Sequence, residues 1–424
     1  ADALGYPETY YTPSMEAVDR IEIIRGAASL QYGTQFGGLL NFVMKEGEKD
    51  KPFVLESRQT IGSYGLLSSF NRIGGSKNKW QYYISHQYKQ GNGWRPNGKY
   101  NLHSFYGKIN YHINEHSKLG IEYSKYNYDS QQSGGLTDYL FEKDATQSIR
   151  ERNWFSIDWN ILALNYDHEF KNGDKINSRF FGLRGYRKSL GFLGMISRVD
   201  PLTDRDLIIS DYFNMGNETR WIQKYSIGNV LGTFLLGGRV YKGNTVNKQG
   251  DGNDGYGPDY IFNNPNELEG SDYTFPSDNV SIFVENYMAF NEHWTLTPGI
   301  RYELINTKSY GYFKETETDL AGNVIFEQVL NDTTEQNREL VLFGLGSSYK
   351  IGDMEVYANI SQNYRAINFT DLRITNPNQE VDNNIKDERG FNSDLGFRGK
   401  FSKSINYDIS LFCLFYKDRI GEIY

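Results

Sequence analysis

The sequence predicts an all-β fold, a transmembrane antiparallel β-barrel, and three observations support this prediction. Aromatic residues make up 15% of the 424 residues, with 33 tyrosines and 26 phenylalanines, yet the mean hydropathy is −0.63. Apolar and polar residues alternate along most of the chain, as in strands that have one polar and one apolar face. The connections between these segments are alternately short and long. A polar lumen, an apolar lipid face and aromatic girdles give a membrane barrel this composition.

The composition also argues against other classes of protein. A disordered chain would lack the aromatic residues, and a helical membrane protein would contain apolar runs of about 20 residues, which the sequence does not have. The net charge of −8 argues against a nucleic-acid binder. The single cysteine, Cys413, excludes a disulfide framework or a cysteine metal site, and the six histidines are scattered. We expect no cofactor, and no nucleophile and base stand together to suggest an enzyme.

Alternating segments begin at about residue 52 and continue to the end of the chain. In residues 405–413 and 294–304 every second residue is apolar, and we count about 15 strands of this kind. A large soluble β-sandwich or propeller is the alternative, but its strands are usually shorter, and no repeat typical of propeller blades is present. The apolar register of 294–304 places Arg301 and Glu303 on the lumen face of their strand.

The connections favour a barrel of the outer-membrane type. Short turns rich in turn-forming residues lie between some pairs of strands, and long connections lie between the others. The long connections cover roughly 129–160, 188–212, 244–277, 307–338 and 364–389. A barrel must close, and bacterial barrels of one chain have an even number of strands. An odd count of about 15 therefore leads us to expect a segment of a longer protein that lacks both ends.

One stretch near the N-terminus, residues 18–45, differs from the rest: "VDRIEIIRGAASLQYGTQFGGLLNFVMK". It reads as a strand, a turn region of small residues and a second strand. Glycines at 33, 37 and 38 do not form the G-x-G-x-x-G pattern of a phosphate-binding loop. The stretch closely resembles the end of the plug domain of TonB-dependent outer-membrane receptors. The positions that carry this resemblance are Val18, Arg20, Ile21, Glu22, Ile23, Arg25, Gly26, Ser29, Tyr32, Gly33, Gly38, Leu39, Asn41 and Lys45.

The resemblance implies a 22-stranded barrel that is occluded by an N-terminal plug, in the outer membrane of a Gram-negative bacterium. Residues 1–48 would be the C-terminal part of the plug, and residues 50–424 would be a partial barrel surrounded by outer-membrane lipids. The family further implies that the TonB–ExbB–ExbD complex supplies energy, and that the segment that binds TonB precedes residue 1. One departure is Leu39–Leu40, where the family prefers a β-branched residue.

Within the family, the chain is most similar to receptors for ferric dicitrate. Residues 133–153, 296–305 and 356–372 carry this similarity, together with "YGTQFGGLLNFV". It implies active transport of a ferric chelate, either ferric citrate or a related anionic siderophore, with iron carried by the chelate. The alternatives are uptake of haem, cobalamin or an oligosaccharide, or a passive porin or adhesin. A porin needs no plug, and the long connections contain no histidine that could bind haem.

Arginines that face the lumen near the long-loop end would suit an anionic ligand, because a guanidinium group pairs with a carboxylate through two hydrogen bonds. Alternation places Arg239 and Arg301 on the lumen face, although such arginines also form salt bridges with wall or plug carboxylates. The resemblance implies that a plug glutamine and further loop arginines also bind the ligand. It adds an asparagine at a position where relatives have a glutamine. The candidate ligand-binding residues are Gln35, Arg187, Arg205, Arg239, Arg301 and Asn368.

Overall fold

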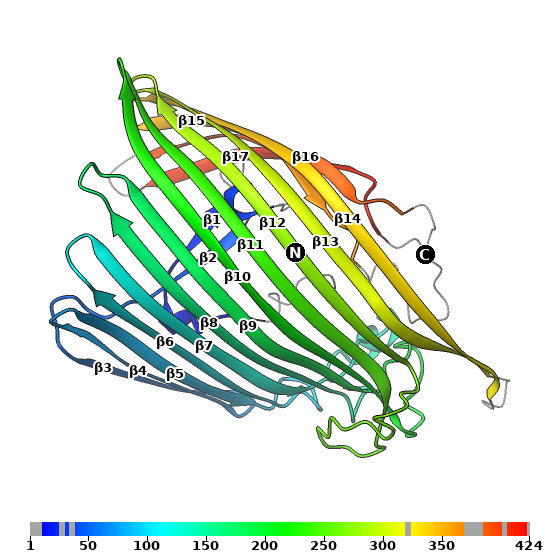
Figure 1. Cartoon of the computed structure of the whole chain (residues 1–424). Coiled ribbons are helices and arrows are strands. Elements are labelled where there is room, and N and C mark those ends of the chain that lie inside the picture. The colour runs from blue at the N-terminus through cyan, green and yellow to red at the C-terminus, as the bar shows by residue number, and fades with distance from the viewer. Residues whose placement is uncertain are drawn as a thin grey trace.

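A computed structural model describes residues 11–24, 30–33, 39–318, 324–368, 385–400 and 405–421. The described strands form two antiparallel sheets, one of two strands and one of 15 strands. Each strand of the large sheet pairs with the next strand along the chain. This sheet curves strongly, and the small sheet lies on its concave side (Figure 1). No helix among the described residues is long and apolar enough to span a membrane.

The small sheet pairs β1 (Val18–Ile24) with β2 (Leu39–Met44), and a 3-10 helix, Met15–Ala17, precedes it. One short helix, α1 (Asp138–Lys143), lies between β7 and β8. The strands of the large sheet are β3 (Val54–Gly62), β4 (Leu66–Lys77), β5 (Trp80–Gly91), β6 (Tyr100–His112), β7 (Ser117–Gln131), β8 (Trp154–Glu169), β9 (Lys175–Gly191), β10 (Arg205–Ile227), β11 (Val230–Gly252), β12 (Ser271–Ala289), β13 (Trp294–Thr318), β14 (Val324–Ile351), β15 (Met354–Arg365), β16 (Glu388–Lys400) and β17 (Asn406–Lys417). The predicted count of about 15 barrel strands is confirmed.

Short and long connections alternate, as predicted. The connections 78–79, 228–229 and 352–353 are two-residue turns, and Gly228 and Gly352 adopt positive φ angles of 58° and 60°. Two-residue hairpins of this twist need residues that tolerate positive φ, which glycine does at no steric cost. The long loops 132–153, 192–204 and 253–270 lie at the opposite end of the sheet, at the lower right of Figure 1.

One of the predicted long connections is wrong. Residues 307–338 do not form a loop: β13 continues to Thr318, and its pairing with β14 runs from Thr307↔Gln336 to Glu317↔Phe326. The segment is rich in charged and polar residues, which suggested a loop. However, a strand that extends beyond the membrane does not contact lipid, so it needs no apolar face. Backbone hydrogen bonds to the neighbouring strand are sufficient to form the pairing there. The β13–β14 hairpin reaches past its neighbours in Figure 1.

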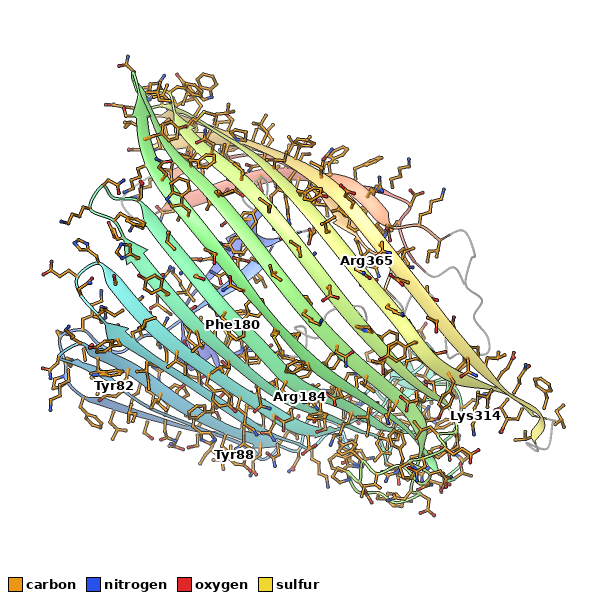
Figure 2. All side chains as sticks on the ribbon, viewed as in Figure 1. Tyr82, Tyr88, Phe180, Arg184, Lys314 and Arg365 are labelled. Carbon is orange, nitrogen blue, oxygen red and sulfur yellow. The ribbon has the colours of Figure 1, made fainter. Side chains whose placement is uncertain are left out.

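The two faces of the large sheet differ in the way that the alternation predicted. On β13, Ile300 and Leu304 are exposed on the convex face, whereas Arg301 and Glu303 between them are 1% and 5% exposed. On β12, Val280 and Ile282 are exposed and Ser281 is buried. Apolar side chains therefore cover the convex face of the sheet, and polar side chains turn inward, as in a membrane barrel. Figure 2 shows these side chains along the strands.

The first described residues pack against the concave face at three separate places, and one of them is Tyr11, whose ring lies 5.6 Å from that of Tyr126 on β7. Ala17 joins a buried cluster with Phe70, Tyr83 and Tyr106 of β4, β5 and β6. Leu30 joins another buried cluster whose wall residues are Ile305, Leu342 and Tyr364 of β13, β14 and β15. The N-terminal segment therefore bridges strands that are far apart in the order of the sheet.

Candidate functional site: the lumen arginines and the loop arginines

Arg301 is the most enclosed of the candidate residues. Its Nε donates to Glu303 Oε2 at 3.0 Å, its Nη2 to Ser281 Oγ at 2.7 Å, and its Nη1 to the backbone carbonyl of Leu30 at 3.1 Å. Asn279 donates to the other oxygen of Glu303 at 2.8 Å. Arg301 therefore ties the N-terminal segment to the wall. It lies closer to the start of β13 than to its end, so the expected position near the long loops is wrong for this residue.

The segment Leu30–Gly33 rests on the same part of the wall. The ring of Tyr32 lies under the guanidinium of Arg220, 4.8 Å from its centroid, and Gln31 Nε2 donates to Glu285 Oε2 at 3.4 Å. Gly33 has a φ of +106°, a conformation that side chains of L-residues rarely adopt. The glycine expected from the sequence motif is therefore required by the turn at this position.

Arg239 faces the concave side of β11 and is half-buried. Its Nη1 lies 4.0 Å from Glu218 Oε2, and its guanidinium lies over the rings of Phe181 and Tyr241, at 5.4 and 5.8 Å. The predicted lumen orientation is confirmed, because Val240 next to it is exposed on the outer face. The salt bridge that was weighed as the alternative to ligand contact is present, although it is long.

Arg205, at the start of β10, is fully buried in a loop contact. Its Nε donates to the carbonyl of Asn253 at 2.7 Å, and its Nη1 donates to the carbonyl of Gly257 at 2.8 Å. Nη2 donates to Asn253 Oδ1 at 2.6 Å. It shares the outward register of Phe213 and Met215, which are exposed on the convex face. Arg205 therefore anchors the loop 253–270.

Two further arginines, Arg152 and Arg150, have the same role, although neither was predicted from the sequence. Arg152 is 1% exposed and binds Asp200 through Nε at 3.0 Å and the carbonyl of Asp254 through Nη1 at 2.8 Å. Arg150 donates to the carbonyls of Met195 and Arg198, both at 3.0 Å. Together with Arg205 they join the loops 132–153, 192–204 and 253–270. Loop residues follow no periodic pattern, so burial of these arginines has no signature in the sequence.

The carboxyl group of Asp200 has a perturbed pKa. Its partial burial opposes ionisation, but hydrogen bonds from Arg152 and from the backbone N–H of Leu202 outweigh burial and hold its pKa below the usual range. Asp200 is therefore ionised at neutral pH and stabilises the arrangement of the joined loops.

Arg187 has a different environment from the other arginines. It lies on the concave face of β9, close to the end of that strand at Gly191, and its guanidinium stacks over Phe155 at 5.8 Å. Its register neighbours are Ile157 and Ser210. The surrounding wall is aromatic, with Trp159 and Tyr212 in edge contact at 5.1 Å. Arg187 is thus a lumen cation near the long-loop end.

The remaining candidates are less defined. Asn368 lies three residues after the end of β15 and is half-buried. Gln35 lies outside the described residues. The described candidates do not converge on one pocket. Arg239 and Arg301 lie on the concave wall away from the long loops, and Arg187 lies on the same face but closer to the long loops. Arg205 lies under a loop.

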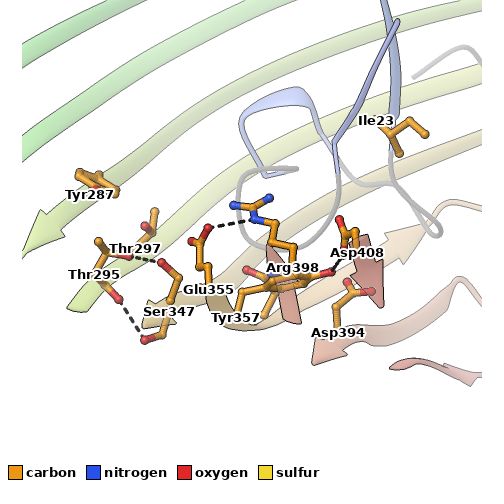
Figure 3. Close-up of a pocket in the computed structure, with 13 residues that line it drawn as sticks. Ile23, Tyr287, Thr295, Thr297, Ser347, Glu355, Tyr357, Asp394, Arg398 and Asp408 are labelled. Carbon is orange, nitrogen blue, oxygen red and sulfur yellow. Dashed lines mark hydrogen bonds and ion pairs between the residues drawn. The ribbon is translucent and has the colours of Figure 1, made fainter. Parts of the chain in front are cut away.

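A cavity of about 500 Å³ lies between β1 and the short-turn ends of β12 to β17 (Figure 3). Arg398 Nε donates to Glu355 Oε2 at 2.9 Å, and Tyr357 donates to Asp408 Oδ1 at 2.9 Å. Asp394 also lines this cavity, so carboxylates outnumber its single arginine. This charge does not suit an anion, and none of the candidate residues lines the cavity. No group of three or more metal-ligating side chains is present in the described part of the chain.

A curved antiparallel sheet with an apolar outer face is typical of a membrane β-barrel, and the two-stranded sheet lies against its inner face. The family model described as "TonB dependent receptor-like, beta-barrel" matches residues 110–424, which is more than half of the chain. The chain therefore belongs to the TonB-dependent receptor family, whose members are transporters in the outer membrane of Gram-negative bacteria.

Solved structures agree on the fold. The chain is similar to the unliganded ferric citrate transporter FecA, with a TM-score of 0.78 at 18% identity, and the match covers 99% of this chain and 60% of FecA. The siderophore receptor PiuA from Acinetobacter baumannii gives a TM-score of 0.74 at 14% identity, over 94% of this chain and 62% of PiuA. The copper transporter OprC gives a TM-score of 0.72 at 13% identity, over 96% of this chain and 60% of OprC. The chain thus spans less than two thirds of the length of each of these proteins.

Proposed function

We propose that the protein actively transports a ferric chelate, ferric citrate or a related anionic siderophore, across the outer membrane, with energy from the TonB–ExbB–ExbD complex. Membership of the receptor family supports energy coupling through TonB, and the likeness to FecA is consistent with a ferric chelate. The observation that carries the proposal is the position of Arg187, a cation on the concave face near the long loops. A guanidinium at that depth suits a carboxylate-rich chelate.

The other candidate residues enter the proposal in different ways. Gln35 and Asn368 would donate amide hydrogen bonds to the chelate. Arg205, Arg239 and Arg301 have protein partners, so they would contact a ligand only by exchanging those partners. Long loops would sequester the chelate, and force from TonB would then remodel the plug. That movement must break the contact from Arg301 to Leu30 before the ligand is released inward.

The aromatic wall favours a second candidate substrate, a siderophore that itself contains aromatic rings. Tyr126, Tyr128 and Phe155 are partly buried and pack against the same buried cluster of the wall, with ring centroids 5.7 Å apart in the tyrosine pair and 6.0 Å apart between Tyr128 and Phe155. Phe155 lies under the guanidinium of Arg187. Catecholate rings can stack on such side chains while an arginine offsets the charge of the chelate. Both substrates use the same site and differ in which contacts dominate.

Uptake of radiolabelled iron by iron-limited cells tests the proposal. The intact receptor would be supplied with ferric citrate or with a ferric tricatecholate, in cells with and without TonB. Arg187→Ala should weaken uptake of the anionic chelate by about tenfold or more, because a hydrogen bond to a charged group is lost. The matched control is Arg184→Ala on the same strand, whose side chain pairs with Asp211 on the outer face and should leave uptake unchanged (Figure 2).

The outcomes separate the two substrates and the proposal itself. Uptake of ferric citrate that depends on TonB and on Arg187 supports the first substrate. Uptake of the tricatecholate alone supports the second. If neither iron source is taken up in a TonB-dependent manner, the transport of ferric chelates is refuted and another ligand of the family must be sought.

A further inference from the structure

Two of the six histidines, which are scattered along the sequence, come together on the outer face of the large sheet. His86 lies on β5 and His103 on β6, and both side chains are exposed. His86 Nε2 lies 3.3 Å from His103 Nδ1, and the ring centroids are 5.6 Å apart. The strands β4 and β7 flank this hairpin, so the pair lies inside the sheet and not at its edge.

The pair lies towards the end of the sheet that carries the long loops. His103 is three residues from Tyr100, the first residue of β6, and His86 is five residues from Gly91, the last residue of β5. About 9–11 residues of a tilted strand cross the hydrocarbon layer. Because β5 and β6 contain 12 and 13 residues, the pair lies in the outer part of the span and not at its centre.

The outer face becomes polar at this level. From the short turn to the long loop, the outward residues of β5 are Trp80, Tyr82, Ile84, His86, Tyr88 and Gln90. Tyr88 lies nearer the long-loop end than Tyr82 (Figure 2). The flanking strands agree, because Asn71 of β4 is in register with His86 and Asn127 of β7 is in register with His103. The two imidazole rings therefore face a polar surface that dissolved ions can reach from the long-loop side.

The spacing of the two ring nitrogens matches a shared metal ion. Zinc binds imidazole nitrogen at about 2.0–2.1 Å with tetrahedral angles, so two nitrogens on one zinc ion lie about 3.3–3.4 Å apart. His86 Nε2 and His103 Nδ1 already have this separation, which the register of the two strands sets. A neutral imidazole can carry its proton on either nitrogen, so rotation of the rings and a change of tautomer direct both lone pairs at a common point.

We propose that His86 and His103 bind one Zn²⁺ ion on the outer face of the barrel. No third histidine, cysteine or carboxylate joins the pair among the described residues, so water molecules complete the tetrahedral shell. Imidazole is a ligand that zinc prefers, whereas Mg²⁺ and Ca²⁺ prefer oxygen. The ring of Tyr88, 4.8 Å from that of His103, limits the movement of one ligand. This site is separate from the concave face and does not depend on the proposed transport.

A zinc titration of the intact receptor tests this assignment. The receptor would be purified in detergent without a histidine tag, stripped of metal, and titrated at neutral pH against a chromophoric zinc chelator. We expect one zinc ion for each receptor, and no competition from Mg²⁺. His86→Phe and His103→Phe should each weaken binding by about tenfold or more, because loss of a ligand costs at least as much as loss of a residue that orients one. Phenylalanine keeps an aromatic ring at each position.

His168→Phe provides the matched control. His168 is a histidine of β8 whose Nδ1 lies 2.8 Å from Ser117 Oγ, so this variant should bind zinc as the unmodified receptor does. X-ray absorption at the zinc edge should count two imidazoles in the unmodified receptor and one in each single variant. Zinc should also raise the unfolding midpoint of the unmodified receptor but not that of the double variant. Zinc binding that survives in the double variant, or a spectrum with fewer than two imidazoles in the unmodified receptor, would overturn the proposal.

Discussion

The ion pair between Arg301 and Glu303 makes a quantitative prediction about the role of Arg301. Both side chains are almost completely buried, and the pair lies where the wall meets Leu30. Replacing Arg301 by methionine leaves the carboxylate of Glu303 buried with Asn279 as its remaining side-chain partner. An uncompensated buried charge of this kind costs about 3–5 kcal/mol. We therefore expect Arg301→Met to lower stability by that amount.

A double-mutant cycle separates the loss of the pair from the loss of the side chain. Replacing both residues by methionine removes the stranded charge, so the double variant should be within about 1 kcal/mol of the unmodified protein or more stable. Guanidinium unfolding of the intact receptor in lipid vesicles, followed by tryptophan fluorescence, gives the midpoint and slope for each variant. Arg239→Met is the control, because its ion pair is long and half-exposed and should contribute less than about 1 kcal/mol.

The same cycle decides whether Arg301 contacts the ligand. If Arg301 is structural, the single variant should be less stable than the unmodified protein, and the double variant should regain that stability. A ligand arginine loses affinity for the chelate while the unfolding midpoint stays the same. Unchanged stability of Arg301→Met combined with lost binding of the chelate would show that the hydrogen bonds to Leu30 and Glu303 are not its main role.

Three further predictions concern the wall and the loops. Gly185→Ala should destabilise the barrel by about 1–3 kcal/mol, because an added Cβ would lie 1.7 Å from the ring of Trp159, and a lowered unfolding midpoint relative to Gly257→Ala, where the space is open, checks this. Arg205→Ala should speed proteolysis of the loop 253–270, and unchanged cleavage rates would contradict its anchoring role. The folded-state pKa of Asp200 is depressed, so its stabilising effect is complete above the usual aspartate pKa of about 4 and is lost as the pH falls through the folded value. A fluorophore on the loop 192–204 should therefore report a more mobile loop in acid. In Asp200→Asn this loop should be mobile already at neutral pH.

The sequence predicted the strands well because a membrane barrel imposes a period of two residues on every segment that crosses the lipid. The register of β13 is an example, since the exposed Ile300 alternates with the buried Arg301. The extent of the strands was harder to predict. Outside the lipid nothing selects apolar residues on the outer face, so the polar pairing of β13 with β14 beyond Thr307 carries no such period.

The candidate site was harder to predict from sequence than the fold, because alternation shows the face on which a side chain lies but not its partners. Arg239 and Arg301 face the lumen as predicted, yet Arg301 is saturated by Glu303, Ser281 and a backbone carbonyl. Arg205 is enclosed by loop carbonyls, although the family resemblance made it a candidate for binding the ligand. Long-range partners of this kind depend on which loops and strands meet in space, and a single sequence does not contain that information.

Burial and partner type together divide the arginines into two groups that should differ in how they tolerate substitution by lysine. An arginine held by backbone carbonyls, such as Arg152 or Arg205, depends on loop geometry, and lysine cannot replace its planar set of donors. A lysine in place of Arg187 would keep a positive charge over the ring of Phe155 on the concave face. Arg187→Lys should therefore retain much of the uptake that Arg187→Ala loses, whereas Arg205→Lys should loosen the loops as much as Arg205→Ala does. Equal loss of uptake in both substitutions at Arg187 would instead indicate a bidentate contact with a carboxylate of the chelate.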